Sequence, residues 1–311
     1  MIAMGKTAAR REALRVHCAV PGMDVLGESP LWCERTQSLL WLDIDSGRLQ
    51  RLHPASGRHD VFTFDQRFVG SLALTHDATT VLLGIDLGLY HFHMGSGALR
   101  LLCLVEDPAL DNRLNDGRCD SRGRFWVGTM DNQLHRANGA FYRIDTDGSV
   151  HRQFADVIVS NTVALSPAQD RLYFSDTRRF TTWMFDLDIA AGVLSNRRIF
   201  ADHAGTSERP DGACVDAQGY LWNAIFAAGR VVRFAPDGKV DTVLELPVTN
   251  PTCVCLGGPE LRTLYITTAR KFLDRSHLRR EPLSGSLLAV EVDVPGIAEH
   301  RFGQASESDA P

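Results

Sequence analysis

Short runs of alternating apolar and polar residues follow one another along the whole chain, and no segment has a convincing helical periodicity. One four-residue pattern recurs: an apolar residue, a large apolar or aromatic residue, an apolar or small residue, and a small or acidic residue. Its six copies are residues 40–43, 81–84, 125–128, 172–175, 221–224 and 264–267. Successive copies begin 41 to 49 residues apart, so the chain is predicted to consist of six equivalent units.

Each copy lies among further strand-like runs that are rich in β-branched and aromatic residues. One run precedes each copy, near residues 28–33, 70–75, 115–119, 161–166, 211–215 and 252–256. A second run follows each copy, at residues 48–53, 88–93, 140–145, 182–187, 230–235 and 286–292. A third run follows in five units, at residues 60–64, 99–105, 150–154, 197–200 and 241–246. The units are therefore predicted to hold four short strands each.

Repeats of this length with four strands are typical of a β-propeller. We predict an all-β, six-bladed β-propeller over residues 13–303, with flexible ends at residues 1–12 and 304–311. The sixth unit lacks a fourth strand, and the spare strand at residues 13–20 is expected to complete it and close the ring. The alternative, two β-sandwich domains, is disfavoured by the near-constant spacing and the lack of a linker.

Composition narrows the choice of partners. The 33 basic and 38 acidic residues give a net charge of −5, which leaves no basic excess for nucleic acid. No apolar run is long enough to cross a bilayer, and the start of the chain lacks the apolar core of a signal peptide. Seven cysteines, an odd number, favour reduced thiols. We expect a soluble, globular, cytoplasmic protein, with its oligomeric state open.

The first strand of each blade lines the central channel of a propeller, so equivalent positions in the six first strands should face one another. These positions are Glu28, Gly70, Asn115, Asn161, Asp211 and Thr252. Four of them carry carboxylate or carboxamide oxygens, which suit Ca²⁺, Mg²⁺ or Mn²⁺. The lack of His or Cys disfavours a zinc site of the nitrogen or sulfur type. The alternative is that these residues are polar because they border turns.

Several motifs together resemble the senescence-marker-protein/gluconolactonase family, which includes regucalcin and bacterial sugar lactonases. They are residues 27–32, 113–117, 123–130, 160–161, 209–212 and 264–270. The resemblance covers nearly the whole chain, with the motifs in the same order. It implies a six-bladed propeller with one catalytic divalent cation, whose identity (Ca²⁺, Mg²⁺, Mn²⁺ or Zn²⁺) stays open.

The resemblance also implies roles for individual residues. The metal ligands of the family map onto Glu28, Asn161 and Asp211, three positions that the repeat comparison selects independently. Its substrate contacts map onto Arg113 and Asn115. Asp211 is the best candidate for the catalytic general base, with a metal-bound hydroxide as the alternative.

Two positions depart from the family pattern. Thr162 follows Asn161 where the family usually has glycine, and threonine favours extended backbone, so the backbone beside Asn161 is expected to differ. Some family members have a substrate-binding glutamate where this chain has Gln133. The acidic contact is then either Asp131 or missing, which leaves the choice of sugar open.

The function implied by the resemblance is hydrolysis of a sugar lactone to the aldonic acid. Alternatives are a regucalcin-like calcium-binding or regulatory protein, a related metal-dependent esterase, and a scaffold for protein partners. Other motifs have simpler interpretations: His91 and His93 on a solvated blade face, Cys253 and Cys255 as buried thiols, and residues 145–148 as a hairpin turn. The basic segment 270–280 is interpreted as a solvated loop or as part of the channel rim.

Overall fold

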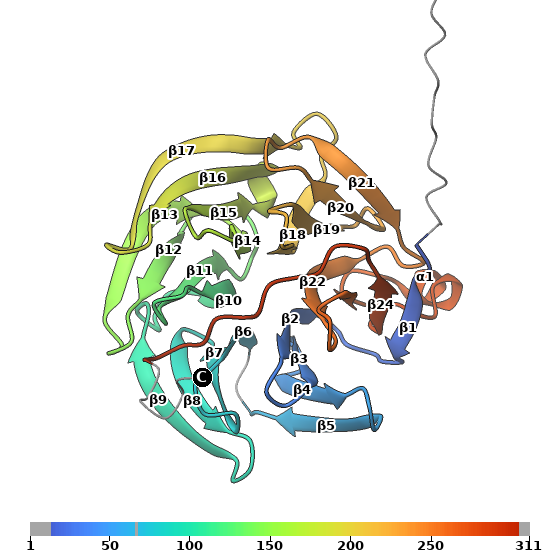
Figure 1. The fold of residues 1–311 in the computed structure, drawn as a ribbon, viewed down its shortest axis with the longest axis horizontal. Helices are drawn as coiled ribbons and strands as arrows, with labels where there is room; N and C mark the ends of the chain where they lie inside the picture. The colour runs from blue at the N-terminus through green and yellow to red at the C-terminus, as the bar shows by residue number, and fades with distance from the viewer. Residues whose placement is uncertain (1–13, 66–67, 305–311) are drawn as a thin grey trace, which may run out of the picture.

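Six four-stranded antiparallel sheets surround a central axis in the computed structural model, which describes residues 14–65 and 68–304 (Figure 1). Blade 1 consists of β2 (Gly27–Cys33), β3 (Ser38–Asp43), β4 (Arg48–His53) and β5 (Arg58–Thr63). Blade 2 consists of β6 (Val69–Leu74), β7 (Thr80–Ile85), β8 (Gly88–His93) and β9 (Ala98–Leu104). Blade 3 consists of β10 (Asn112–Cys119), β11 (Phe125–Asp131), β12 (Gly139–Ile144) and β13 (Val150–Val157).

The remaining blades follow in chain order. Blade 4 consists of β14 (Ser160–Leu165), β15 (Arg171–Asp176), β16 (Thr181–Asp188) and β17 (Val193–Asp202). Blade 5 consists of β18 (Arg209–Val215), β19 (Leu221–Phe226), β20 (Arg230–Phe234) and β21 (Val240–Glu245). Blade 6 consists of β22 (Pro251–Gly257), β23 (Thr263–Thr268), β24 (Leu287–Glu291) and β1 (His17–Val20).

The predicted six-bladed propeller is confirmed, including its closure. β1 pairs with β24, so the start of the chain supplies the outer strand of the last blade. Each copy of the recurring four-residue pattern lies in the second strand of its blade. The flexible ends predicted at residues 1–12 and 304–311 lie outside the described residues, apart from Gln304, and stay a prediction.

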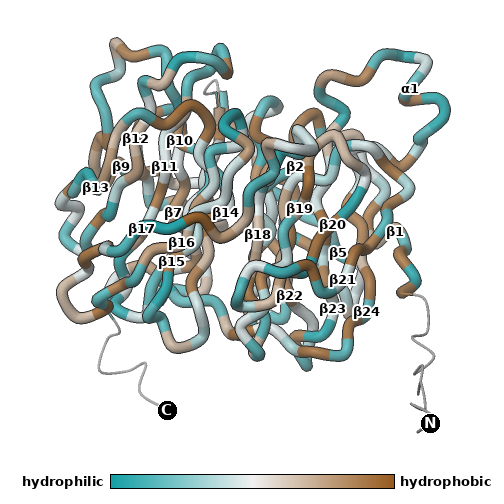
Figure 2. The backbone as a smooth tube through the Cα atoms, turned by 90° about the horizontal axis from the view of Figure 1, so that it is seen from above, coloured by the Kyte–Doolittle hydropathy of each residue, from teal (hydrophilic) through white to brown (hydrophobic). Residues whose placement is uncertain are grey.

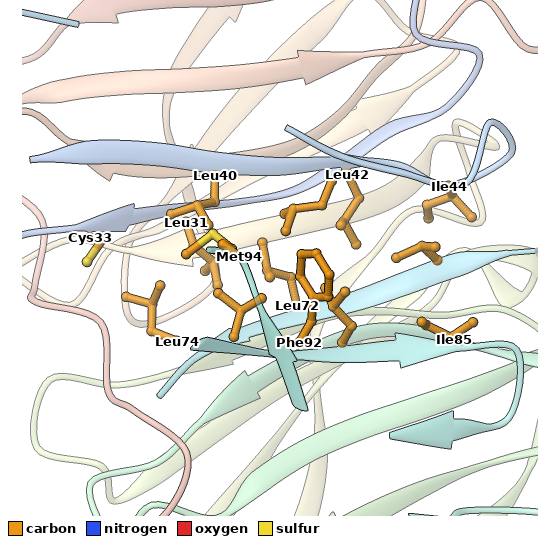
Figure 3. Close-up of a cluster of buried hydrophobic side chains, with 14 of the residues drawn as sticks. Leu31, Cys33, Leu40, Leu42, Ile44, Leu72, Leu74, Ile85, Phe92 and Met94 are labelled. Atoms are coloured by element: carbon orange, nitrogen blue, oxygen red, sulfur yellow. The ribbon is translucent and has the colours of Figure 1, made fainter. Parts of the chain in front are cut away.

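Apolar side chains on the faces of the blades hold the ring together. Each of the six junctions between neighbouring blades contains one cluster of buried apolar residues. Between blades 1 and 2, Leu40 and Leu42 face Leu72 and Phe92 (Figure 3). Neighbouring blades cover the inner strands, so β2 and β6 are buried along their whole length, whereas outer strands such as β5 keep exposed residues.

The inner strands share one irregularity that shapes the centre of the ring. The pairing of each inner strand with its neighbour shifts register near its first residues. Such a bulge leaves residues unpaired and turns their side chains in a new direction. We call the face of the ring at which the inner strands begin the site face.

The opposite face is crossed by the C-terminal segment 293–304, which we call the strap (Figure 1). The backbone N–H groups of Phe302 and Gly303 donate to the carbonyls of Leu74 and Gly123, and the Pro295 carbonyl accepts from Ala217. Leu74, Gly123 and Ala217 lie at or just beyond the ends of inner strands. With further contacts of His300 to Gln169 and of Gly296 to Leu261, the strap joins blades 2 to 6 on the face away from the starts of these strands.

The connection between β23 and β24 lies on the site face and contains the short helix α1 (Arg275–Arg280), which stands out from the upper edge in Figure 2. Lys271 in this connection forms an ion pair of 2.7 Å with Asp45 of blade 1. The basic segment 270–280 is thus part of the rim, with a helical turn that the sequence pattern did not predict. No helix in the described part of the chain is long and apolar enough to span a membrane.

Candidate active site

Three of the predicted residues begin the inner strands of blades 1, 4 and 5. Glu28, Asn161 and Asp211 are buried, with 5, 3 and 7% of their surfaces exposed. Each stands at the bulge of its strand, so its side chain leaves the pleat of the sheet. Burial raises the pKa of Asp211, and the negative charge of Glu28 raises it further.

The side-chain amide of Asn161 is fixed in one orientation. Its Nδ2 donates to Thr177 Oγ1 at 2.8 Å, and the Thr177 hydroxyl in turn donates to the carbonyl of Pro210 at 2.7 Å. Its Oδ1 accepts from Asn115 Nδ2 at 3.1 Å. The amide oxygen therefore lies on the side of the other site residues, where it can bind a cation.

The backbone of Asp211 is held from two sides. Its carbonyl oxygen accepts hydrogen bonds from Thr162 Oγ1 at 2.6 Å and from Asn223 Nδ2 at 2.8 Å. The expectation that Thr162 favours extended backbone is wrong: its φ is +57°, in the left-handed region usual for glycine. The side chain is fully buried, and the hydrogen bonds of its hydroxyl to Asp211 and Ser175 hold it there.

The nearby positive charge does not neutralise the carboxylates of Glu28 and Asp211. Burial, and next the charge of Asp116, raises the pKa of Glu28 to about 8, against the opposing effects of the Ser29 N–H group and Arg113. Glu28 Oε2 accepts only this N–H, at 3.0 Å, among the described residues. Burial and the charges of Glu28 and Asp116 likewise raise the pKa of Asp211. A bound cation would relieve this repulsion.

This donor set fits a hard divalent cation. Glu28, Asn161 and Asp211 offer two carboxylates and one amide oxygen, the ligand types of Ca²⁺, Mg²⁺ and Mn²⁺. No group of three or more His, Cys, Asp and Glu side chains in the described residues could hold a metal ion, so a site here depends on the amide.

Arg113 and Asn115 lie beside the carboxylates, on the inner strand of blade 3. The Arg113 guanidinium donates to the Leu114 carbonyl at 3.0 Å and to Asn115 Oδ1, and it lies 5.6 Å from the ring centre of Phe68. Burial lowers the pKa of Arg113, while the charges of Asp45, Glu28 and Asp211 oppose this shift. The structure thus brings all five residues Glu28, Arg113, Asn115, Asn161 and Asp211 together.

Asp131 is not part of this cluster. Its carboxylate is fully buried at the end of β11, where it accepts hydrogen bonds from Arg136 at 2.6 and 3.0 Å and from the backbone of His135. These bonds lower its pKa although burial opposes them. Gln133 is exposed and donates to Asp111 at 3.2 Å. A substrate role for Asp131 stays a prediction, with a carboxylate already bonded within its own turn.

Asp116 is a buried acid near the site that the sequence comparison did not select. Its Oδ2 accepts from the Val163 N–H at 2.7 Å, and burial raises its pKa to about 6 against the charge of Arg118. The sequence motif could have indicated Asp116, since it directly follows Asn115. Only the bulge, which leaves both residues out of the ladder, brings this neighbour toward the centre as well.

The remaining positions of the predicted ring have structural roles. A Cβ atom at Gly70 would lie 2.1 Å from the Leu114 carbonyl oxygen, so only glycine fits between blades 2 and 3. Thr252 Oγ1 donates to the carbonyl of Gly27. Cys253 and Cys255 are buried thiols, as predicted, and residues 145–148 form the predicted hairpin turn.

Comparison with known proteins agrees with this fold. The family described as the SMP-30/gluconolactonase/LRE-like region matches residues 26–270. The chain belongs to this family. The resemblance inferred from the motifs is therefore confirmed, and the match includes every residue assigned to the site.

Relatives within the family cover nearly all of the chain. A 6-deoxy-6-sulfogluconolactonase of Pseudomonas putida is 38% identical, over 92% of this chain and 97% of that protein. An L-arabinolactonase of Azospirillum brasilense is 34% identical, over 90% and 92%. The solved structure of regucalcin from Agrobacterium tumefaciens, described as a calcium-binding protein, superposes with a TM-score of 0.88 at 30% identity, covering 93% and 98% of the two chains.

Proposed function

We propose that this protein hydrolyses a sugar lactone to the corresponding aldonic acid and that it requires a divalent cation. The observation that carries the proposal is the buried pair Glu28 and Asp211, whose charges repel each other and are opposed by Arg113 only in part. The family and the lactonases among the relatives support the same reaction.

Glu28, Asn161 and Asp211 would hold the cation. When bound, such a cation polarises a carbonyl oxygen and lowers the pKa of water, which are the two needs of ester hydrolysis. Arg113 would donate to the lactone oxygens as charge develops on them, because its planar fork of N–H groups suits oxygen pairs. Asn115, held by Arg113 and by the Ser160 carbonyl at 2.7 Å, would orient a ring hydroxyl.

Asp211 is our candidate for the general base. Its side chain receives no hydrogen bond from another side chain in the described residues, and burial raises its pKa, so the carboxyl can accept a proton more readily than an exposed aspartate. A bound cation acts in the opposite direction, so the base strength depends on how the cation is shared with Glu28.

Acid release from a panel of lactones tests the proposal. The protein is stripped of metal with a chelator, and gluconate-, galactonate-, arabinonate- and xylonate-type lactones are then offered with Ca²⁺, Mg²⁺, Mn²⁺ or Zn²⁺. We expect hydrolysis that disappears on stripping and returns with at least one ion. Absence of hydrolysis with every pair of lactone and ion would contradict the proposal.

A calcium-binding protein without catalysis is the second candidate. It is favoured by the all-oxygen donor set and by the structural similarity to a regucalcin described as calcium-binding. Calorimetric titration with Ca²⁺ distinguishes the two: tight binding without hydrolysis of any lactone would support the second candidate.

A further inference from the structure

Arg209 occupies in blade 5 the place that Arg113 occupies in blade 3. Arg113 pairs with Met130, and Arg209 pairs with Phe226, in both cases at the start of the inner strand and before the bulge. Arg209 precedes Asp211 by two residues, as Arg113 precedes Asn115. Its side chain therefore begins on the site face, directly beside a proposed metal ligand.

The surroundings of these two arginines differ. Arg113 is buried and donates to a carbonyl and to Asn115. Arg209 is partly exposed, and its guanidinium has no hydrogen bond or ion pair with any residue that the structure describes. Since a guanidinium carries five N–H donors in a rigid fork, Arg209 offers unused donors on the site face.

A second arginine stands beside it. The short turn η1 (Thr177–Arg179) rests on the start of β18 through the hydrogen bond from Thr177 to the Pro210 carbonyl. Arg178 in this turn is exposed, and its side chain also lacks a partner among the described residues. The two arginines thus come from adjacent blades to the same part of the rim.

The acids nearby do not neutralise this pair. Asp176 accepts hydrogen bonds from the backbone N–H groups of Ile158 and Arg178, and it lies 3.6 Å from Arg179. Glu208 forms an ion pair with Arg230. Asp176 and Glu208 are thus engaged elsewhere, and among the described residues neither pairs with Arg178 or Arg209.

We propose that Arg209, with Arg178, forms a subsite for an anionic substituent of the lactone, remote from the carbonyl that is attacked. The proposal rests on the proposed function. Sulfonate, phosphate and carboxylate groups share the required chemistry, because each presents oxygens that an arginine fork binds in pairs. The subsite makes a lactone with a terminal oxyanion the preferred substrate over its neutral counterpart.

Steady-state kinetics with matched substrates test the subsite. Gluconolactone is compared with its 6-phospho and 6-sulfo derivatives and with the lactone of the C6 carboxylic acid, using wild type and Arg209→Met loaded with the activating cation. We expect the KM for the anionic lactones to rise about 10- to 100-fold in the variant, as for loss of a hydrogen bond to a charged group. The kcat and the kinetics with the neutral lactone should change less than about twofold.

Two further variants are controls. Arg209→Lys keeps the charge without the fork and should have an intermediate KM. Arg279→Met removes a positive charge from α1 on the same face and should leave the ratio of anionic to neutral substrate unchanged. Equal effects of Arg209→Met on neutral and anionic lactones, or no effect on either, would overturn the proposal. A preference among the three anions identifies the substituent.

A wrong proposed function would give a different result from a wrong subsite. If wild type hydrolyses none of these lactones, the subsite is tested by calorimetric titration of the full chain with inorganic phosphate. Binding by wild type that is at least tenfold weaker in Arg209→Met supports the subsite. Equal binding by the two proteins, or none by wild type, overturns it.

Discussion

Buried charges are paired on the strap face of the ring but not on the site face. On the strap face, Arg118 forms an ion pair with Glu299 and donates to the carbonyls of Val163 and Ala213, at 3.2 and 3.0 Å. On the site face, Glu28 and Asp211 share one nearby arginine, Arg113, and their pKa values are raised. The two faces of the ring thus differ: the strap face holds a paired charge, and the site face holds acids that repel each other.

This difference separates a structural role from a functional one. A buried ion pair whose remaining donors reach carbonyls needs no further ligand, so Arg118 and Glu299 hold the strap across the ring. Buried carboxylates that repel each other destabilise the fold, and their presence is explained when a ligand supplies the missing positive charge. Asp116 lies between the two ends and responds to charges at both: Arg118 lowers its pKa, and Asp116 itself raises that of Glu28.

The largest effect is expected from Asp211→Asn, which removes one of the unmatched charges. Lactone hydrolysis should fall at least about 10²-fold, because the base and a cation ligand are lost together. The metal-free variant should melt no lower than metal-free wild type, since the repulsion from Glu28 is gone. Initial rates and thermal denaturation check this, with Asp145→Asn in the hairpin turn as a control. Full activity in Asp211→Asn would remove Asp211 from the site.

Removing the ion pair between Arg118 and Glu299 on the strap face should affect stability instead of catalysis. Glu299→Gln leaves Arg118 largely buried without its counter-ion, which should lower the free energy of unfolding by about 3–5 kcal/mol. The KM and kcat should stay within about twofold of wild type. Denaturant titration measures the loss, and the double variant Arg118→Met/Glu299→Gln should lose less than the two single variants combined. Additive losses would contradict a coupled pair.

Raising the pH should strengthen metal binding. In the metal-free protein the pKa of Glu28 is raised to about 8, so folding is favoured with this group protonated, and that stability is lost as the pH rises from about 5 toward 8. A cation competes with this proton, so its affinity should grow by up to about tenfold per pH unit over this range. Calorimetry at several pH values, and the rise in melting temperature on adding metal, measure the trend. A pH-independent affinity would contradict it.

A smaller effect is expected from Thr162→Val, which keeps the shape of the side chain but removes its hydroxyl. The Asp211 carbonyl then loses one of its two side-chain hydrogen bonds, which should cost about 1 kcal/mol in stability. Metal affinity should fall severalfold, because Asn161 and Asp211 flank this residue. Thr162→Ser retains the hydroxyl and should behave as wild type. If both variants bind metal equally well, Thr162 does not position the site.

Regular features of the chain made the fold predictable. The recurring pattern depends only on local alternation and spacing, and β1 was identified because the sixth unit lacked a strand. The positions of Glu28, Asn161 and Asp211 followed from the same repeat, since equivalent residues of inner strands meet at one end of the axis.

The parts that escaped prediction depend on contacts between distant segments. Nothing in the local sequence marks residues 293–304 as a strap, because its bonds reach blades 2 to 5, which are far away in the chain. The position of Asp116 near the site could not be predicted without the bulge in β10. Thr162 adopts a left-handed backbone although threonine favours an extended one. Hydrogen bonds between its hydroxyl and three neighbouring strands outweigh a conformational cost of about 1–3 kcal/mol.

The pairing of β1 with β24 has a consequence for how the protein is made. His17 lies opposite Ala289, so β1 cannot pair until β24, which comes much later in the chain, has been synthesised. Until then the half-built ring presents the bare faces of its first and last blades and an unpaired strand edge, which are surfaces prone to aggregation. Closure of the ring therefore cannot precede the synthesis of residues 287–291, and a chain that stops before them stays open.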